Sequence, residues 1–257
     1  MNLNCIRPKS KENGGKSAKS IDKTYRICYN ERKNEGERMR ILYTDKDLLL
    51  CRKPAGIPSQ PDPSGQSDLL TSLQADYPTV SLIHRLDTPT GGVMVFGLAP
   101  KATAKLCALV QDHSLFCKEY LAVLSSPPPD AEGRLTDFLY HEKQRNKAFV
   151  TDGKRKGSKE AVLDYRVLST LPDGHTLILV RLHTGRTHQI RVQLASRGLP
   201  LVGDGKYGSR EKAPFIGLWA YRLTFPHPIT GKEITASARP DTEAFPWSLF
   251  HDQIPSD

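Results

Sequence analysis

The segment LIHRLDTPTGGVMVFGL, residues 82–98, joins a polar turn to an apolar run. His84, Arg85 and Asp87 lie within four residues of one another, in a stretch rich in Thr, Pro and Gly. The apolar run from 92 to 98 has the length of a buried strand. A carboxylate placed there would emerge at the end of a rigid strand, where a guanidinium lowers its pKa and keeps it ionised. The segment predicts a core strand that carries a functional acid, although a polar turn taken alone also fits a structural role.

The composition excludes a membrane-spanning protein. Of the 257 residues, 38% are hydrophobic and 25% are charged, and no apolar run approaches the ~18–20 residues of a spanning helix. A chain of this length buries roughly 70–75% of its extended surface, which is enough for one large domain or two small ones. The five cysteines are scattered, without a CxxC pair or a signal-peptide region, as is typical of reduced thiols in a cytoplasmic protein.

Residues 1–40 differ from the rest of the chain in charge. They hold eleven Lys or Arg against five Asp or Glu, within a chain whose net charge is +9. The segment has no sustained apolar period, so we expect it to be disordered. Two interpretations stay open: a basic arm that grips RNA, and an inert leader or over-extended gene start with translation beginning at Met39. The folded domain is expected over residues 41–250.

The remaining pattern predicts more strands than helices, without regular alternation between them. Helices are expected at 67–77, at 101–110 and from Thr187, as the N-cap, to near Gly198. A loop at 125–130 would connect two halves of the fold. This order favours an α+β fold with a largely antiparallel sheet. The expected strands lie at 41–53 (two short strands), 92–98, 118–124, 148–151, 161–169, 177–182 and 218–225.

Five further motifs accompany the HRLD sequence along the chain. They are KPAG from Lys53, KEYLA at 118–122, TGRTHQIR at 184–191, Gly203-Asp204 with Tyr207, and HPITG at 227–231. This ordered set resembles the RluA family of RNA pseudouridine synthases, over residues 41–240. The resemblance implies the pseudouridine synthase fold, an α+β fold with a mixed, mostly antiparallel central sheet, flanking helices and a catalytic cleft.

The resemblance also implies an isomerase. Such an enzyme breaks the bond between ribose and nitrogen 1 of uracil, rotates the base and rejoins the sugar to carbon 5. Substrate and product are isomers, so no energy source, metal or redox cofactor is expected. The expected partner is structured rRNA or tRNA, and the protein is expected to be a cytoplasmic monomer that binds neither a membrane nor a nucleotide cofactor.

Three residues match the family's catalytic positions. Asp87 would either attack the sugar carbon or act as a base toward the ribose, and both alternatives stay open. Tyr120 would stack on the uracil and is a candidate to accept the proton from carbon 5. Arg191 would pair with Asp87, and on a helix it shares a face with His188, three residues earlier.

Five residues are expected to bind substrate or RNA: Arg85, His84, Arg186, His188 and Lys53. Arg85 resembles the family residue that occupies the space left by the extruded nucleotide, and extrusion costs a few kcal/mol that protein contacts offset. Arg186 is expected to hold phosphate or backbone carbonyls. Lys53 and Pro54 are expected to shape the floor of the cleft.

The chain departs from the family pattern at two positions. Gly91 stands where the family often has Ser, and we expect this change to affect only the backbone of a turn. Trp219 stands where the family commonly has His, which puts in doubt any role for a histidine there.

Two other functions compete with the enzyme interpretation. A non-catalytic RNA-binding protein could keep the same fold, but the intact Asp87, Tyr120 and Arg191 set argues against it. The GDGKYG segment, 203–208, formally fits a dinucleotide-binding glycine motif, yet no apolar helix is expected after it. The spacing of His and Cys residues predicts no metal site.

Overall fold

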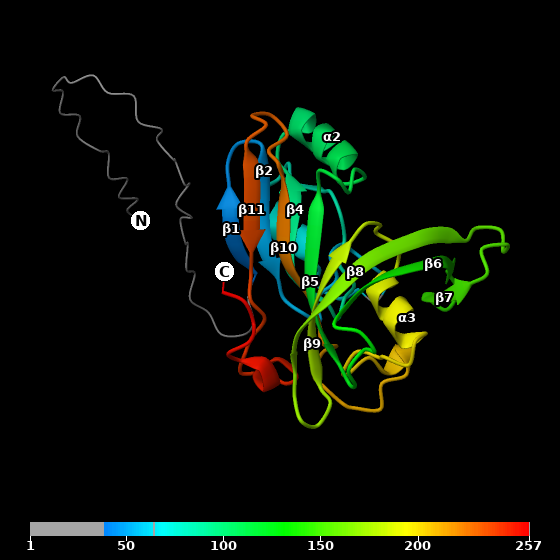
Figure 1. The fold of residues 1–257 in the computed structure, drawn as a ribbon. Helices are drawn as coiled ribbons and strands as arrows, with labels where there is room; N and C mark the ends of the chain where they lie inside the picture. The colour runs from blue at the N-terminus through cyan, green and yellow to red at the C-terminus, as the bar shows by residue number, and fades with distance from the viewer. Residues whose placement is uncertain (1–38, 64, 257) are drawn as a thin grey trace, which may run out of the picture.

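The computed structural model describes residues 39–63 and 65–256, which form one large sheet with few helices (Figure 1). The strands are β1 (Arg40–Thr44), β2 (Leu48–Lys53), β3 (Ser81–Leu82), β4 (Gly91–Gly97), β5 (Cys117–Leu124), β6 (Glu132–Glu142), β7 (Lys147–Thr151), β8 (Lys159–Thr170), β9 (Thr176–Leu182), β10 (Leu218–Pro226) and β11 (Glu233–Ser237). The helices are α1 (Leu69–Gln74), α2 (Pro100–Leu109) and α3 (Gln189–Ala195), with short 3₁₀ turns η1 (Gly205–Tyr207) and η2 (Trp247–Phe250).

The sheet is mixed and mostly antiparallel, which confirms the predicted fold class. Its strand order is β1-β2-β4-β10-β5-β9-β8-β6-β7, with β11 beside β10 and β3 beside β4. Among the described strands, only β4 and β10 run parallel, through the pairs Trp219↔Gly91 and Ala220↔Gly92. The centre of the sheet therefore joins segments that lie far apart in the sequence.

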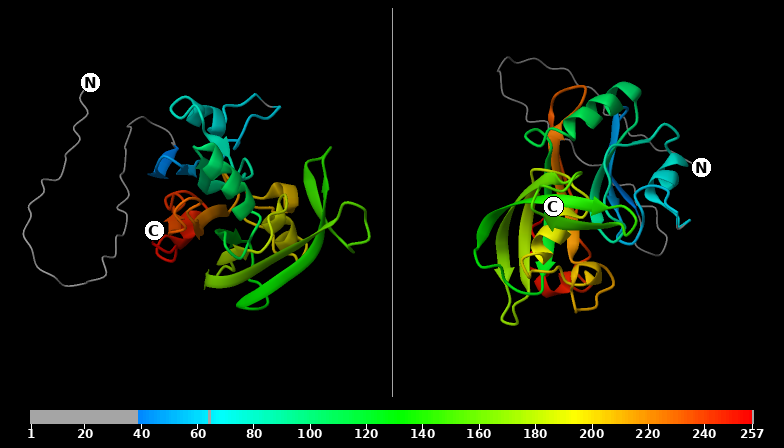
Figure 2. Two further views of the ribbon diagram at one scale, coloured as in Figure 1. Left: turned by 90° about the horizontal axis from the view of Figure 1, so that it is seen from above. Right: turned by 90° about the vertical axis from the view of Figure 1, so that its right-hand side faces the viewer.

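The sheet bends between its two halves. Figure 2 shows β6 and β8 turned away from the part of the sheet that contains β1 and β2. α3 packs against β6 and β7 on the inner side of this bend. Strands β5 and β9 lie between the two halves. Side chains on one face of β5 therefore point toward the inner side of the bend.

The core has two main layers because alternate residues of each strand point to opposite faces. Leu49 of β2, Tyr120 of β5 and Ile190 of α3 belong to one apolar cluster. Leu48 of β2 and Leu106 of α2 belong to another. The helices α2 and α3 therefore cover different faces, and Tyr120 faces the side of α3.

Sequence patterns missed three strands, β3, β6 and β11. β6 is the longest of them, and only Leu135 and Leu139 are buried along it. Its other side chains are largely polar, so its apolar period is weak. The predicted cap at Thr187 is wrong: His188 occupies the N-cap of α3 with a φ of 53° and makes no capping hydrogen bond.

Residues near both ends of the described chain pack against the core. Met39 packs against the core, and Ile254 is 4% exposed beside Trp219 and Trp247. The prediction for residues 1–40 lies, apart from its last two residues, outside the described residues.

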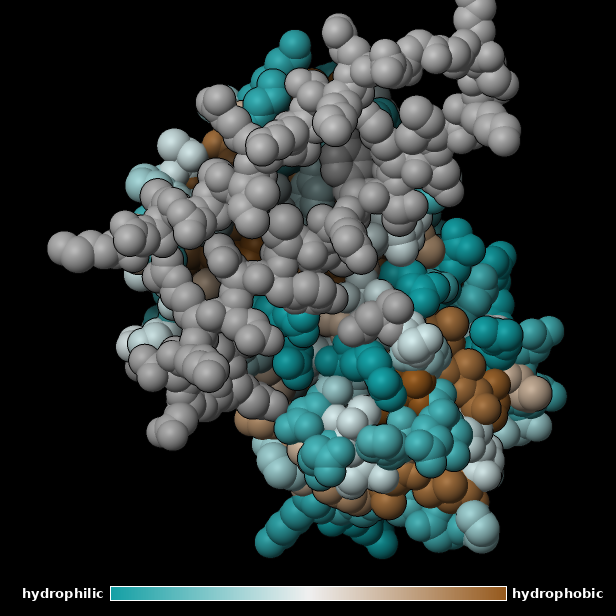
Figure 3. Space-filling view, turned by 90° about the vertical axis from the view of Figure 1, so that its left-hand side faces the viewer, coloured by the Kyte–Doolittle hydropathy of each residue, from teal (hydrophilic) through white to brown (hydrophobic). Residues whose placement is uncertain are grey.

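The described surface seen in Figure 3 mixes hydrophilic and hydrophobic side chains. Within residues 39–63 and 65–256, no helix has the length and apolar character needed to cross a membrane.

Candidate active site

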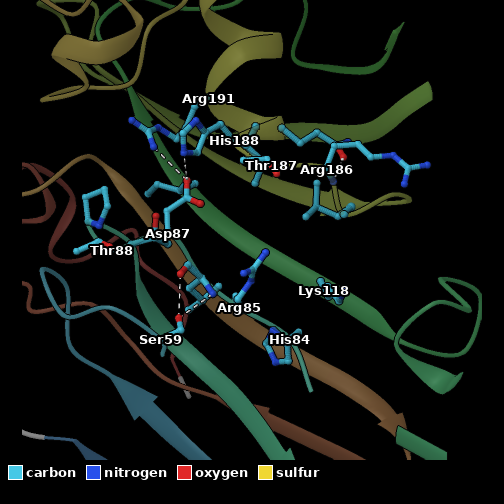
Figure 4. Close-up of a pocket in the computed structure, with 18 of the residues that line it drawn as sticks. Ser59, His84, Arg85, Asp87, Thr88, Lys118, Arg186, Thr187, His188 and Arg191 are labelled. Carbon is cyan, nitrogen blue, oxygen red and sulfur yellow. Dashed lines mark hydrogen bonds and ion pairs between the residues drawn. The ribbon is translucent and has the colours of Figure 1, made fainter. Parts of the chain in front are cut away.

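A cleft of about 880 Å³ opens on the inner side of the bend. Three segments line it: the turn before β4, one face of β5, and the loop that leads into α3 (Figure 4). Seven of the residues predicted for the site line it: His84, Arg85, Asp87, Tyr120, Arg186, His188 and Arg191.

Asp87 lies in the turn before β4, and the backbone of this turn is fixed on both sides. The amide of Thr90 donates to the carbonyl of Asp87 over 3.0 Å. The amide of Gly56 donates to the carbonyl of Thr88 over 2.8 Å. The side chain of Asp87 is 26% exposed and reaches into the cleft. The turn therefore presents the carboxylate at the end of a rigid strand, as the sequence predicted.

Lys53 lies beneath this turn. Its ammonium donates to the carbonyls of Pro54, Ile57 and Thr88 at 2.8, 2.6 and 3.3 Å. Burial lowers the pKa of Lys53 to about 7, although the negative charge of Asp87 acts to raise it. Because the residue is 0% exposed, the prediction that Lys53 contacts RNA is wrong. The ammonium holds the backbone below the cleft, as expected for a residue that shapes its floor.

Arg191 of α3 joins two carboxylates. Its Nη1 lies 3.1 Å from Asp87 Oδ2, while its Nε and Nη2 donate to Asp204 Oδ2 and Oδ1 over 2.7 and 2.8 Å. Arg191 is 4% exposed and Asp204 is 1% exposed. Burial by itself would lower the pKa of Arg191. The hydrogen bonds and the negative charge of Asp204 outweigh this effect, so the pKa of Arg191 lies above its usual value. The predicted Asp87–Arg191 pair is present. Asp204 binds the other nitrogens of the Arg191 guanidinium and so orients it toward Asp87.

His188 also faces Asp87, with its Nε2 3.7 Å from Asp87 Oδ2. Its Nδ1 lies 2.8 Å from the hydroxyl of Tyr207, which accepts the amide hydrogen of Ala148 over 2.8 Å. Burial lowers the pKa of His188 to about 4, although the charge of Asp87 acts in the opposite direction. A neutral imidazole that accepts the phenol hydrogen at Nδ1 carries its own hydrogen on Nε2, toward Asp87.

Residues 203–208 supply Asp204 and Tyr207 to this network. The segment forms a turn with η1 and leads into β10 without an intervening α-helix. The sequence marked Asp204 and Tyr207 as a motif but assigned them no role, because their partners Arg191 and His188 lie elsewhere in the chain.

Tyr120 and His84 line the cleft as neutral groups. Burial, helped by the charge of Asp87, raises the pKa of Tyr120 above its usual value. Burial, helped by the charge of Lys118, lowers the pKa of His84 to about 3. The amide of Val95 donates to Nε2 of His84 over 3.2 Å, so this imidazole serves as an acceptor for the backbone of β4.

Arg85 and Arg186 bring positive charge to the cleft. Arg85 is exposed and extends into the cleft (Figure 4), with no hydrogen bond or ion pair to any described residue. Arg186 is also exposed, and its Nε donates to the carbonyl of Glu160 over 2.8 Å. Arg186 thus holds a backbone carbonyl, one of the two roles predicted for it.

The two departures from the family pattern lie against each other. Gly91 and Trp219 are paired residues of β4 and β10, and a Cβ atom on Gly91 would overlap the Trp219 ring. The prediction that Gly91 affects only a turn is therefore wrong, since glycine makes room for the indole. Trp219 is 4% exposed, donates through Nε1 to the carbonyl of Ala238 over 2.6 Å and does not line the cleft.

One group of possible metal ligands occurs among the described residues. Asp45, Asp47 and His227 have ligand atoms within 4.8 Å of one another. His227 Nδ1 accepts the amides of Ile229 and Thr230 over 3.1 Å each, and its Nε2 lies 2.9 Å from Asp45 Oδ2. Both ring nitrogens are thus occupied, so the HPITG motif fastens a turn outside the cleft.

Comparison with known proteins adds independent findings. A family model described as RNA pseudouridylate synthase matches residues 47–196. The chain is 32% identical over 209 residues to the "Dual-specificity RNA pseudouridine synthase RluA" of Escherichia coli strain K12, which covers 78% of this chain and 93% of the relative. It is 34% identical over 233 residues to the "Ribosomal large subunit pseudouridine synthase D" of Pseudomonas aeruginosa, which covers 82% of this chain and 71% of the relative.

Solved structures share the fold. The human RNA Pseudouridylate Synthase Domain Containing 1 aligns with a TM-score of 0.68 at 22% identity, covering 82% of this chain and 87% of the human one. The human RNA Pseudouridylate Synthase Domain Containing 4 aligns with a TM-score of 0.64 at 23% identity, covering 78% and 88%.

Proposed function

The chain belongs to the RluA family of RNA pseudouridine synthases, and from this premise we propose that Asp87 is the carboxylate on which the isomerisation of uridine depends. The observation that carries the proposal is the ion pair of 3.1 Å between Asp87 Oδ2 and Arg191 Nη1 inside the cleft. The Arg191 guanidinium, itself hydrogen-bonded by Asp204, fixes the direction of the Asp87 carboxylate.

The second oxygen of the carboxylate is available for chemistry. Among the described residues, nothing hydrogen-bonds to Asp87 Oδ1, whereas Oδ2 faces Arg191 and His188. In the covalent route, Oδ1 bonds to carbon 1′ of the ribose as the bond to nitrogen 1 breaks, and the uracil leaves as an anion. After rotation, carbon 5 bonds to carbon 1′, the carboxylate is released, carbon 5 loses its proton and nitrogen 1 gains one.

In the alternative route, the same oxygen removes a proton from the ribose to expel the uracil. It returns that proton once carbon 5 has bonded to the sugar. Both routes use the same oxygen of Asp87, so the contact between Arg191 and Oδ2, which leaves Oδ1 open, supports either of them.

Tyr120 is proposed to hold the face of the uracil. It lies on β5 at the cleft, and its raised pKa keeps it a neutral phenol. A neutral phenol is a weak base, so stacking suits the resting side chain better than proton abstraction. Arg85, which extends into the cleft without a partner among the described residues, would fill the space left by the flipped nucleotide.

The proposed substrate is a uridine in structured rRNA or tRNA. The names of the relatives support an RNA substrate, since one is called a dual-specificity RNA pseudouridine synthase and another a ribosomal large subunit pseudouridine synthase. We further propose that the enzyme works as a cytoplasmic monomer without a nucleotide cofactor. A non-catalytic RNA-binding protein is the alternative, and the fixed Asp87–Arg191 pair favours the enzyme.

The test is Asp87→Asn, assayed by tritium release from 5-tritiated uridine in RNA from cells that lack this gene. We expect release to fall by at least ~10³-fold, because the amide can neither displace uracil nor accept a proton. RNA binding should not weaken by more than about twofold, since the amide has nearly the shape of the carboxylate and the substitution removes a negative charge that would face the RNA phosphates. Asp164→Asn is the matched control, because Asp164 pairs with Arg134 outside the cleft and should leave release unchanged. An active Asp87→Asn enzyme would refute the assignment.

A further inference from the structure

Lys118 is a second buried cation of the cleft, on the same strand as Tyr120. The two residues are separated by one position on β5, so their side chains point to the same face, about 6.8 Å apart along the strand. Both line the cleft, and Figure 4 shows Lys118 on its strand. A ligand whose base lies on Tyr120 therefore has its neighbouring atoms within reach of the lysine side chain.

Lys118 has no acidic and no hydrogen-bonding partner in residues 39–63 and 65–256. The residue is 7% exposed, yet its ammonium makes neither a hydrogen bond nor an ion pair there. The nearest interaction is with the ring of Phe116, whose centroid is 5.4 Å from Nζ. Burial alone lowers the pKa of Lys118 to about 8. Lysine is almost never buried without a partner, because removing an ammonium from water is costly.

The neighbours of Lys118 do not neutralise it. His84 and His113 both have pKa values lowered by burial and then by the charge of Lys118, and the charge of Arg186 also acts on His113. The buried Nδ1 of His113 has no hydrogen-bond partner among the described residues. This end of the cleft therefore holds two cations and an unpaired ring nitrogen.

We infer that the Lys118 ammonium receives a phosphate group of the RNA strand adjacent to the target uridine, with Arg186 and His113 beside it. The inference rests on the proposed function, which places the uracil on Tyr120. A phosphate supplies the full negative charge that Lys118 lacks, and its several oxygens suit more than one donor. A base carbonyl would satisfy the hydrogen bond but leave the buried charge uncompensated.

The experiment measures dissociation constants of uridine, 5′-uridine monophosphate, 3′-uridine monophosphate and inorganic phosphate for the full chain by NMR titration. We expect one of the two monophosphates to bind at least ~10-fold tighter than uridine, as for a charge-assisted hydrogen bond to a partly buried ammonium. Lys118→Gln should reduce this ratio to near 1, and Lys118→Arg should keep part of it. Lys101→Gln is the matched control, because Lys101 is an exposed lysine of α2 outside the cleft.

Three outcomes would overturn the inference. One is equal binding of uridine and both monophosphates by the wild-type chain. Another is an unchanged ratio in Lys118→Gln. The third is inorganic phosphate binding as tightly as the preferred monophosphate, which would make this a general anion site rather than part of an RNA site.

Asp87→Asn separates this inference from the proposed function. If both are correct, that variant loses isomerisation but keeps the preference for the monophosphate. An inactive wild-type enzyme with an intact, Lys118-dependent preference would contradict only the proposed function. An active wild-type enzyme without the preference would contradict only the inference.

Discussion

Arg191 and Lys118 are two buried cations of one cleft, and they differ in what surrounds them. Arg191 is 4% exposed and contacts Asp87 and Asp204, whereas Lys118 is 7% exposed and contacts no acid in the described part of the chain. A cation whose charge is satisfied inside the fold orients a neighbouring group. A cation left unsatisfied makes the empty cleft less stable and favours an incoming anion.

The largest effect predicted from this comparison is on stability. Arg191→Met should lower the free energy of unfolding by about 3–5 kcal/mol, because Asp204, 1% exposed, would lose the guanidinium that contacts both of its oxygens. Urea denaturation at pH 7 measures the loss. Arg134→Met removes an exposed partner of Asp164 and should shift the midpoint little.

A compensating variant sharpens this test. Arg191→Met combined with Asp204→Leu removes both charges and should recover a large part of the lost stability. If Arg191→Met lowers the free energy of unfolding no more than Arg134→Met does, the charge of Arg191 is not compensated by Asp204 in the way proposed here.

At the other end of the cleft, removal of the cation is expected to increase stability. Lys118→Met should raise the free energy of unfolding by about 1–3 kcal/mol at pH 7, because it removes a buried charge that has no described partner. The same urea measurement at several pH values checks the cause.

The stability gained by Lys118→Met should decrease as the pH rises. The pKa of Lys118 falls from its ordinary 10.5 to about 8 on folding, so the unfolded chain binds more protons between these values. The wild type is therefore penalised in full below pH 8 and gains stability as the pH rises toward 10.5. The advantage of Lys118→Met should shrink over that window, and a gain that does not change with pH would contradict the explanation.

The smallest effect concerns the second contact of Asp87. Tyr207→Phe removes the hydroxyl shared by His188 and the amide of Ala148, and should cost about 1–2 kcal/mol of stability. Tritium release should fall only modestly, since Arg191 still holds Asp87. Tyr77→Phe is the control, because the Tyr77 hydroxyl has no hydrogen-bond partner among the described residues. A loss of release as large as that of Asp87→Asn would show that His188, and not Arg191, fixes the carboxylate.

Sequence patterns succeeded where a local signal was strong. The apolar run at 92–98 predicted β4, and the alternation in KEYLAVL predicted β5. They failed at β6, where charged side chains alternate with few buried ones, and at Thr187, where His188 takes a left-handed conformation at the N-cap. Such a conformation depends on the contacts of His188 with Tyr207 and Asp87, which local propensity does not contain.

The sequence by itself determined the family and the mixed, mostly antiparallel sheet, because several motifs in a fixed order are specific to one fold. It also predicted Asp87, Tyr120 and Arg191 as candidate site residues. Only the tertiary structure decided how Asp204 supports Arg191, that Lys53 is buried under the turn, that Gly91 makes room for Trp219, and that Lys118 lacks an acidic neighbour. The physical reason is that charge compensation and packing depend on distances between side chains far apart in the chain. Asp87 and Arg191, 104 residues apart, meet only because the bend in the sheet closes around them.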